Sequence, residues 1–249
     1  MNVVYFSPEV SSSLLKQAVV LSPVMPVWDK GEFCLPLTQH LNQAGYCVAV
    51  IDTLSVCTTD EANTSIEEIK QAILKVSANS ELLLCGFALG GALAQCVAAH
   101  LPSVSHLFSV SGPGQQTIEL TTKLGELIAK LRNCELPDAL AQLGQWVAPT
   151  GTFVEMIPAP AACDHELATQ RMLNGFTLLR RLNSRNHLEA FKGRCLLMVG
   201  DKSQMVTASN QICIEREGYE IVSIHNAGMR PWADNPKQVA KYLTQWISL

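Results

Sequence analysis

The chain has 249 residues, of which 48% are hydrophobic and 16% are charged, a balance typical of a globular rather than a disordered protein. Its formal net charge of −4 provides no basic surface, so we expect neither nucleic acid nor a membrane as a partner. The apolar runs are too short to span a membrane, and the N-terminal residues do not resemble a secretory signal. The nine cysteines include no Cys-x-x-Cys pair, which is typical of reduced thiols in a cytoplasmic protein.

Strand and helix patterns alternate through the first 110 residues. Strands are predicted at residues 3–6, 17–21, 46–52, 82–85 and 106–110. Helices are predicted at residues 33–44, 66–76 and 92–99, with Thr64 or Ser65 as the N-cap of the second. This alternation predicts a parallel sheet with helices on both faces.

The alternation breaks at the Gly-Pro-Gly of residues 112–114. The next seventy residues contain helical patterns and no strand pattern, with helices predicted at residues 121–132, 137–147 and 163–182. A strand at 195–199, a helix at 208–216, a strand at 219–224 and a helix at 236–247 complete the chain. We therefore expect one α/β domain over residues 1–249. Its mostly parallel sheet would carry a helical cap, residues 113–190, inserted after the sixth sheet strand.

The most informative stretch lies where the strand at 82–85 turns into a helix. A strand, a sharp turn and a helix form the setting of a nucleophile elbow, whose pattern is Gly-x-Ser-x-Gly. Here residues 86–90 read Gly-Phe-Ala-Leu-Gly. The glycines stand where the backbone must pass close to itself, but the position of the nucleophile holds Ala88.

A second motif follows the last predicted strand. Residues 227–236 read Ala-Gly-Met-Arg-Pro-Trp-Ala-Asp-Asn-Pro and lead into the final helix. Together with the elbow frame, this tail resembles the α/β-hydrolase superfamily, in particular small capped esterases such as the pimeloyl-ester carboxylesterases of biotin synthesis. Their tail reads roughly Ala-Gly-His-x-Pro-Trp-x-Glu-Asn-Pro. The resemblance covers nearly the whole chain and implies the α/β-hydrolase fold.

The same resemblance places the three catalytic positions, and each holds a residue unsuited to its role. Ala88 stands at the nucleophile, Ser203 at the acid and Met229 at the histidine. Alanine has no hydroxyl, and the methionine sulfur does not accept a proton at neutral pH. Three replacements predict a naturally degenerate site with no catalytic residue, no metal and no cofactor.

The cleft between the sheet edge and the cap is nevertheless expected to be apolar and to retain backbone N–H donors from Leu89, Gly90 and either Val24 or Met25. Its predicted ligand-binding residues are Val24, Met25, Phe87, Ala88, Leu89, Met229 and Trp232. The leading hypothesis is a pseudo-hydrolase that binds a small apolar or acyl molecule, or a protein partner.

Two alternatives remain open. Asp201 and His225 lie near the expected acid and histidine positions, and as a relocated pair they could serve a lyase, an isomerase, a cyclase or a weak esterase or thioesterase. The third hypothesis is a scaffolding subunit with a filled cleft. An open pocket favours the binder, a contact between Asp201 and His225 favours the enzyme, and a collapsed cleft favours the scaffold.

Overall fold

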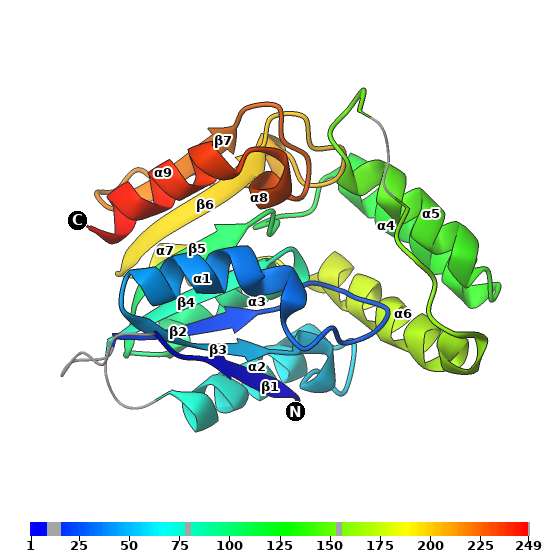
Figure 1. Ribbon diagram of the computed structural model, residues 1–249, viewed down its shortest axis with the longest axis horizontal. Coiled ribbons are helices and arrows are strands. Elements are labelled where there is room, and N and C mark those ends of the chain that lie inside the picture. Colours follow the sequence, from blue (N-terminus) through cyan, green and yellow to red (C-terminus); the bar gives the residue numbers. More distant parts are fainter. Residues whose placement is uncertain (9–15, 78–80, 153–155, 249) are drawn as a thin grey trace.

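The computed structural model describes all residues except 9–15, 78–80, 153–155 and 249. Within these ranges the chain forms a seven-stranded sheet of order β1-β3-β2-β4-β5-β6-β7 (Figure 1). Strand β1 pairs antiparallel with β3, and every other neighbouring pair is parallel. The strands are β1 Val3–Phe6, β2 Lys16–Leu21, β3 Tyr46–Ile51, β4 Leu82–Phe87, β5 Val104–Val110, β6 Arg194–Gly200 and β7 Tyr219–Ile224. The expected α/β class with a mostly parallel sheet is confirmed.

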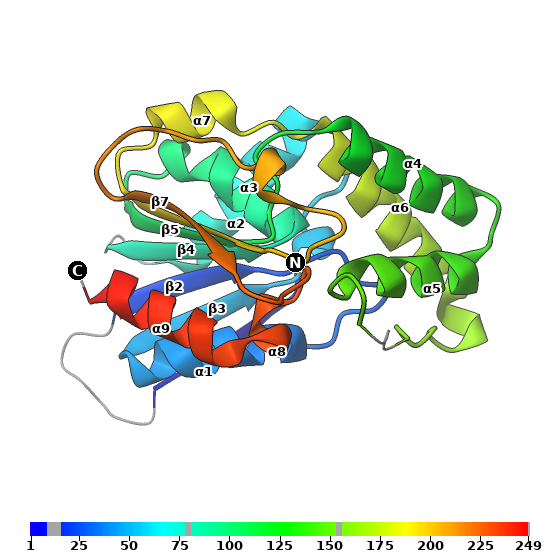
Figure 2. The same ribbon diagram turned by 90° about the horizontal axis from the view of Figure 1, so that it is seen from above.

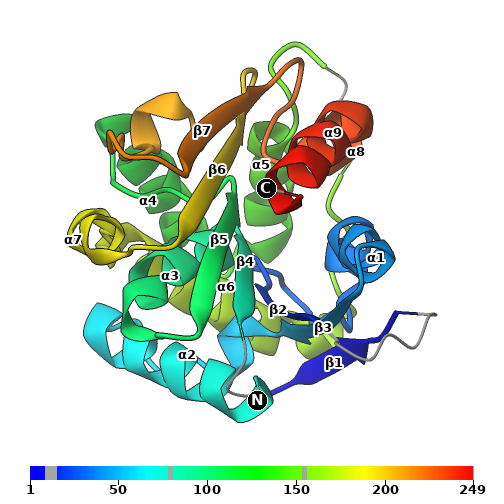
Figure 3. The ribbon, with the colours of Figure 1, turned by 90° about the vertical axis from the view of Figure 1, so that its left-hand side faces the viewer.

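The central strands are apolar because helices cover both faces of the sheet. All six residues of β4 are buried, as expected for a strand inside a parallel sheet. Figure 3 shows α1 and α9 on one face and α2, α3 and α7 on the other. Their bounds are α1 Leu35–Gln43, α2 Ala62–Val76, α3 Leu89–Val97, α7 Arg185–Ala190 and α9 Pro236–Ile247. None of the helices in the described residues is long and apolar enough to cross a bilayer.

Three helices lie beyond the carboxyl ends of the strands, and we call them the cap helices (Figures 1 and 2). They are α4 Ile118–Arg132, α5 Leu136–Val147 and α6 His165–Arg181. The insertion was expected after a sixth strand, but it leaves the sheet after β5, because five strands rather than six precede α4 in the described chain. Helix α7 falls within the expected cap range yet belongs to the sheet layer, where His187 Nδ1 lies 3.0 Å from His100 Nε2.

Several predicted helix boundaries differ from the structure, most clearly at residues 208–216 and at the start of α2. Residues 208–216 form a single 3-10 turn, Ala208–Asn210, rather than a helix. The carbonyl of Asn210 accepts the N–H groups of Gly114 and Gln115, so it is not available to continue a helix. Helix α2 begins after Glu61, one turn before the predicted caps, because the Ser65 hydroxyl donates to the carbonyl of Thr59 instead of capping. A short helix, α8 Pro231–Asp234, was not predicted.

Candidate functional site

The turn between β4 and α3 has the backbone of a nucleophile elbow. Ala88 has φ 47° and ψ −111°, a strained conformation for a residue with a side chain. A Cβ on Gly86 would overlap the carbonyl of Gly90, and a Cβ on Gly90 would overlap the carbonyl of Leu21. The predicted reason for these glycines, the close approach of backbone segments, therefore holds in the structure. The elbow presents a methyl group where a serine hydrolase presents a hydroxyl.

Met229, at the position where the resemblance predicts the histidine, accepts a hydrogen bond through its sulfur. The amide of Val206 donates to Met229 Sδ over 3.4 Å, and the amide of Met229 donates to the carbonyl of Val147 over 2.9 Å. At the predicted position of the acid, Ser203 Oγ is buried and has no hydrogen-bond partner among the described residues. Neither Met229 nor Ser203 therefore supplies a base or a carboxylate to the elbow.

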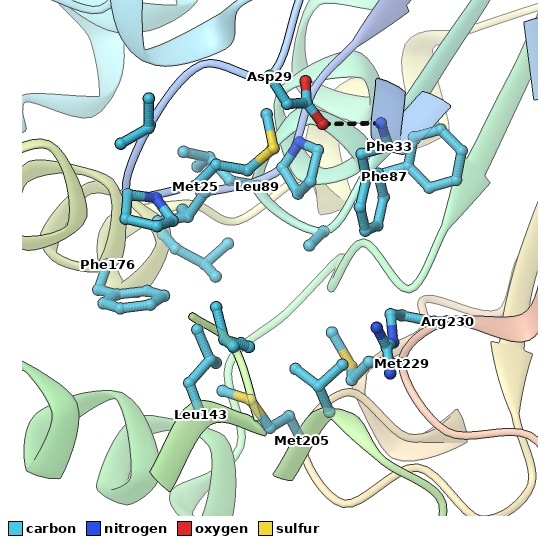
Figure 4. Close-up of a pocket in the computed structure, with 18 of the residues that line it drawn as sticks. Met25, Asp29, Phe33, Phe87, Leu89, Leu143, Phe176, Met205, Met229 and Arg230 are labelled. Carbon is cyan, nitrogen blue, oxygen red and sulfur yellow. Dashed lines mark hydrogen bonds between the residues drawn. The ribbon is translucent and has the colours of Figure 1, made fainter. Parts of the chain in front are cut away.

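A cavity of about 570 Å³ lies between the elbow and the cap helices (Figure 4). This volume falls within the range typical of small-molecule sites, roughly 300–1,000 Å³. Apolar side chains from the elbow, from the loop after β2 and from all three cap helices form most of its wall. Members of that wall include Val24, Met25, Phe33, Phe87, Ala88, Leu89, Leu120, Leu124, Leu143, Val147, Phe176, Leu179, Met205 and Met229. The cleft is therefore open and apolar.

The structure places six of the seven predicted ligand-binding residues on this wall, namely Val24, Met25, Phe87, Ala88, Leu89 and Met229. Trp232 is not among the described lining residues. Its ring centroid lies 6.2 Å from that of Phe108 and 6.4 Å from that of His40, so it packs between the sheet and α1. Trp232 therefore packs against the core instead of lining the cavity, because its ring lies beside Phe108 and His40.

Asp29 and Arg230 are the only charged residues among the described lining residues, and neither was among the predicted site residues. The Asp29 carboxylate accepts the amides of Gly31 over 2.9 Å and Phe33 over 2.7 Å (Figure 4). Arg230 lies beside Met229 in Figure 4, and its buried Nε has no hydrogen-bond partner within the described chain. The sequence signal for Arg230 was its place in the tail motif, directly after the histidine position.

The candidate pair Asp201 and His225 is formed. His225 Nδ1 lies 2.9 Å from Asp201 Oδ2, at the carboxyl ends of β6 and β7. Burial raises the pKa of Asp201, but hydrogen bonds from His225 and from the backbone of Asn226 and Ala227 outweigh it and hold this pKa below its usual value. The side chain of His225 is 71% exposed and that of Asp201 is 31% exposed. Neither residue is among the described lining residues of the cavity. The pair therefore faces solvent, apart from the elbow.

A further sequence cluster, residues 163–166, contains four potential metal ligands. Cys163 and Asp164 are exposed, and His165 Nε2 lies 3.1 Å from the carbonyl oxygen of Pro160. Nowhere in the described ranges do three or more His, Cys, Asp or Glu side chains gather as metal ligands. The arrangement is that of a helix start rich in acidic residues.

Comparison with solved structures places this geometry in a known fold, although no protein-family model and no curated protein matches the chain. An α/β-hydrolase enzyme from a Medee basin deep-sea metagenome library aligns over 99% of this chain and 94% of its own, with a TM-score of 0.76 and 11% identity. An esterase from Exiguobacterium antarcticum aligns over 99% and 95%, with a TM-score of 0.71 and 16% identity. A bromoperoxidase from Bacillus anthracis aligns over 99% and 95%, with a TM-score of 0.76 and 14% identity. The chain has the α/β-hydrolase fold.

Proposed function

We propose that this chain is a catalytically degenerate α/β-hydrolase-fold protein that binds a small apolar or acyl ligand in the cavity and does not cleave esters. The observation that carries the proposal is the open apolar cavity with Ala88 and Met229 on its wall. Side chains that had merely filled a lost active site would have closed this space. Apolar walls with a few polar groups are typical of small-molecule sites.

The chemistry of the wall supports binding over hydrolysis. Serine hydrolysis requires a hydroxyl nucleophile, a base that takes its proton and a carboxylate that orients the base. Ala88 has no hydroxyl. Met229 has no imidazole to serve as the base, and its sulfur accepts a hydrogen bond from the Val206 amide. Without a triad, oxyanion stabilisation by backbone N–H groups and substrate binding accelerate hydrolysis only about 10³- to 10⁴-fold over the uncatalysed reaction in water.

The contact between Asp201 and His225 favours a second candidate, a non-hydrolytic or weakly hydrolytic enzyme that uses this pair as a base. The exposure of both side chains and their separation from the cavity wall argue against it, because a base must reach a proton of a bound substrate. The scaffold hypothesis is the weakest of the three, since the cleft is open.

Binding of the neutral apolar dye N-phenyl-1-naphthylamine tests the proposal. We expect saturable one-to-one fluorescence enhancement with the wild-type chain, and weaker binding by about tenfold or more after Ala88→Phe, which directs a ring into the cavity. Ala190→Phe, on the exposed end of α7, is the matched control and should bind like the wild type. Equal binding by the Ala88 and Ala190 variants, or no saturable binding at all, would reject the proposal.

A further inference from the structure

Arg230 is a cation that has no counter-ion among the residues that the structure describes. It lies on the cavity wall, is partly buried, and forms no ion pair within the described residues. Its Nε is buried without a hydrogen-bond partner. Removing part of a guanidinium from water without pairing it is unfavourable, so a charge in this position is stabilised by a ligand that brings an anion.

Two described carboxylates near Arg230, one on the cavity wall and one close in the sequence, are engaged elsewhere. Both oxygens of Asp29, across the cavity wall, accept backbone N–H groups from its own loop. Asp234, one turn after Arg230, accepts the amide of Gly228 over 2.8 Å. Neither acid lies within ion-pair distance of the guanidinium. Within the described ranges, the guanidinium therefore remains available to a bound molecule.

The rest of the wall sets the chemistry of that molecule. Figure 4 shows Arg230 on the side of Met229, whereas Phe176 and Leu143 lie at the far side of the cavity. A ligand that contacts both regions has one anionic end and an apolar body. A guanidinium matches a carboxylate geometrically, because its parallel N–H groups can bind both oxygens.

We infer that the ligand is an aliphatic monocarboxylic acid whose carboxylate pairs with Arg230 and whose chain lies along the apolar wall. This inference rests on the proposed function, since it requires that the cavity binds a small molecule. It adds the class of ligand and assigns Arg230 as the residue that selects for charge.

The test compares decanoate with 1-decanol, its uncharged counterpart, as competitors of the bound N-phenyl-1-naphthylamine. We expect the wild-type chain to bind decanoate about tenfold or more tightly than decanol, as a charge-assisted hydrogen bond allows. Arg230→Gln should abolish this preference and leave the affinity for decanol unchanged, and Arg230→Lys should retain part of it. Arg180→Gln removes the same charge from an exposed position in the last turn of α6 and should behave like the wild type.

The outcomes separate the two claims. Equal wild-type affinities for decanoate and decanol, or a preference that survives Arg230→Gln, would overturn the assignment of Arg230 while leaving ligand binding intact. If neither the dye nor decanol binds in the cavity, the proposed function fails and this inference fails with it.

Discussion

Arg171 and Asp52 form a two-point ion pair that joins cap helix α6 to the end of β3. The guanidinium donates from Nη2 to Asp52 Oδ1 over 2.8 Å and from Nη1 to Oδ2 over 3.2 Å. The Asp52 side chain is 0% exposed and that of Arg171 is 14% exposed. Arg171 Nε also lies 3.5 Å from the carbonyl of Met25, on the cavity wall. This ion pair therefore anchors cap helix α6, which contributes to the cavity wall, to the end of β3.

Arg171→Met should destabilise the protein by about 3–5 kcal/mol, because it leaves the Asp52 carboxylate buried without its cation. Chemical denaturation measures this loss. Lys70→Met removes a cation from the exposed pair with Glu67 and should change the free energy of unfolding by less than about 1 kcal/mol. Equal effects of the two substitutions would show that Arg171 does not hold the cap helix.

The elbow glycines should tolerate no side chain. Gly90→Ala would place a Cβ against the carbonyls of Leu21 and Ser22, so we expect a loss of about 3 kcal/mol or more, or failure to fold. Gly125→Ala, inside α4, meets only Arg180 Nη1 at 3.9 Å. That substitution should stabilise the protein by up to about 1 kcal/mol, since alanine favours helix. Thermal unfolding measures both effects. A lower melting temperature for Gly90→Ala but not for Gly125→Ala shows that the loss is steric and not a general effect of adding a methyl group.

Restoring the triad tests whether the catalytic frame persists. The combined variant Ala88→Ser, Ser203→Asp and Met229→His should hydrolyse p-nitrophenyl butyrate at least about a hundredfold faster than the wild-type chain. The same variant without Ala88→Ser is the control and should stay silent, because it lacks the nucleophile. A folded triple variant without activity would contradict the assignment of Ser203 and Met229 to the acid and histidine positions.

The Asp201–His225 pair predicts a small pH dependence of stability. The pKa of Asp201 is lowered in the folded state, so its contribution is complete above the unfolded value of about 3.9 and is lost as the pH falls through the lowered folded value. Wild type should exceed Asp201→Asn in stability by less than about 1 kcal/mol at pH 6, because the pair is exposed. At pH 2.5 the difference should shrink. A stability difference that grows on acidification would contradict a lowered pKa of Asp201 in the folded state.

Local sequence patterns were sufficient for most of the fold. The Gly-Phe-Ala-Leu-Gly of residues 86–90 predicted the strand, turn and helix, because the close backbone approaches at Gly86 and Gly90 require residues without a Cβ. Residues 208–216 failed for a non-local reason. The carbonyl of Asn210 bonds to the amides of Gly114 and Gln115, about a hundred residues earlier, and no local pattern encodes that contact.

The candidate site was less predictable from the sequence. The apolar wall followed from the elbow and tail motifs, but Trp232 packs against Phe108 in the core and does not line the cavity. Among the described residues, Arg230 lacks an ion pair while Asp29 and Asp234 bind backbone amides, which the sequence alone does not reveal. Likewise, the contact between Asp201 and His225 depends on the register of β6 and β7, which sequence spacing alone did not establish.

The proposal that this chain binds a ligand without cleaving esters is best tested by turnover. The wild-type chain and the His225→Ala variant are assayed side by side with p-nitrophenyl and acyl-thioester substrates. We expect no release of product above the buffer blank with either protein, while the dye still binds the cavity. Multiple turnovers by the wild type that His225→Ala loses would contradict it. That result would establish a relocated catalytic site at the Asp201–His225 pair.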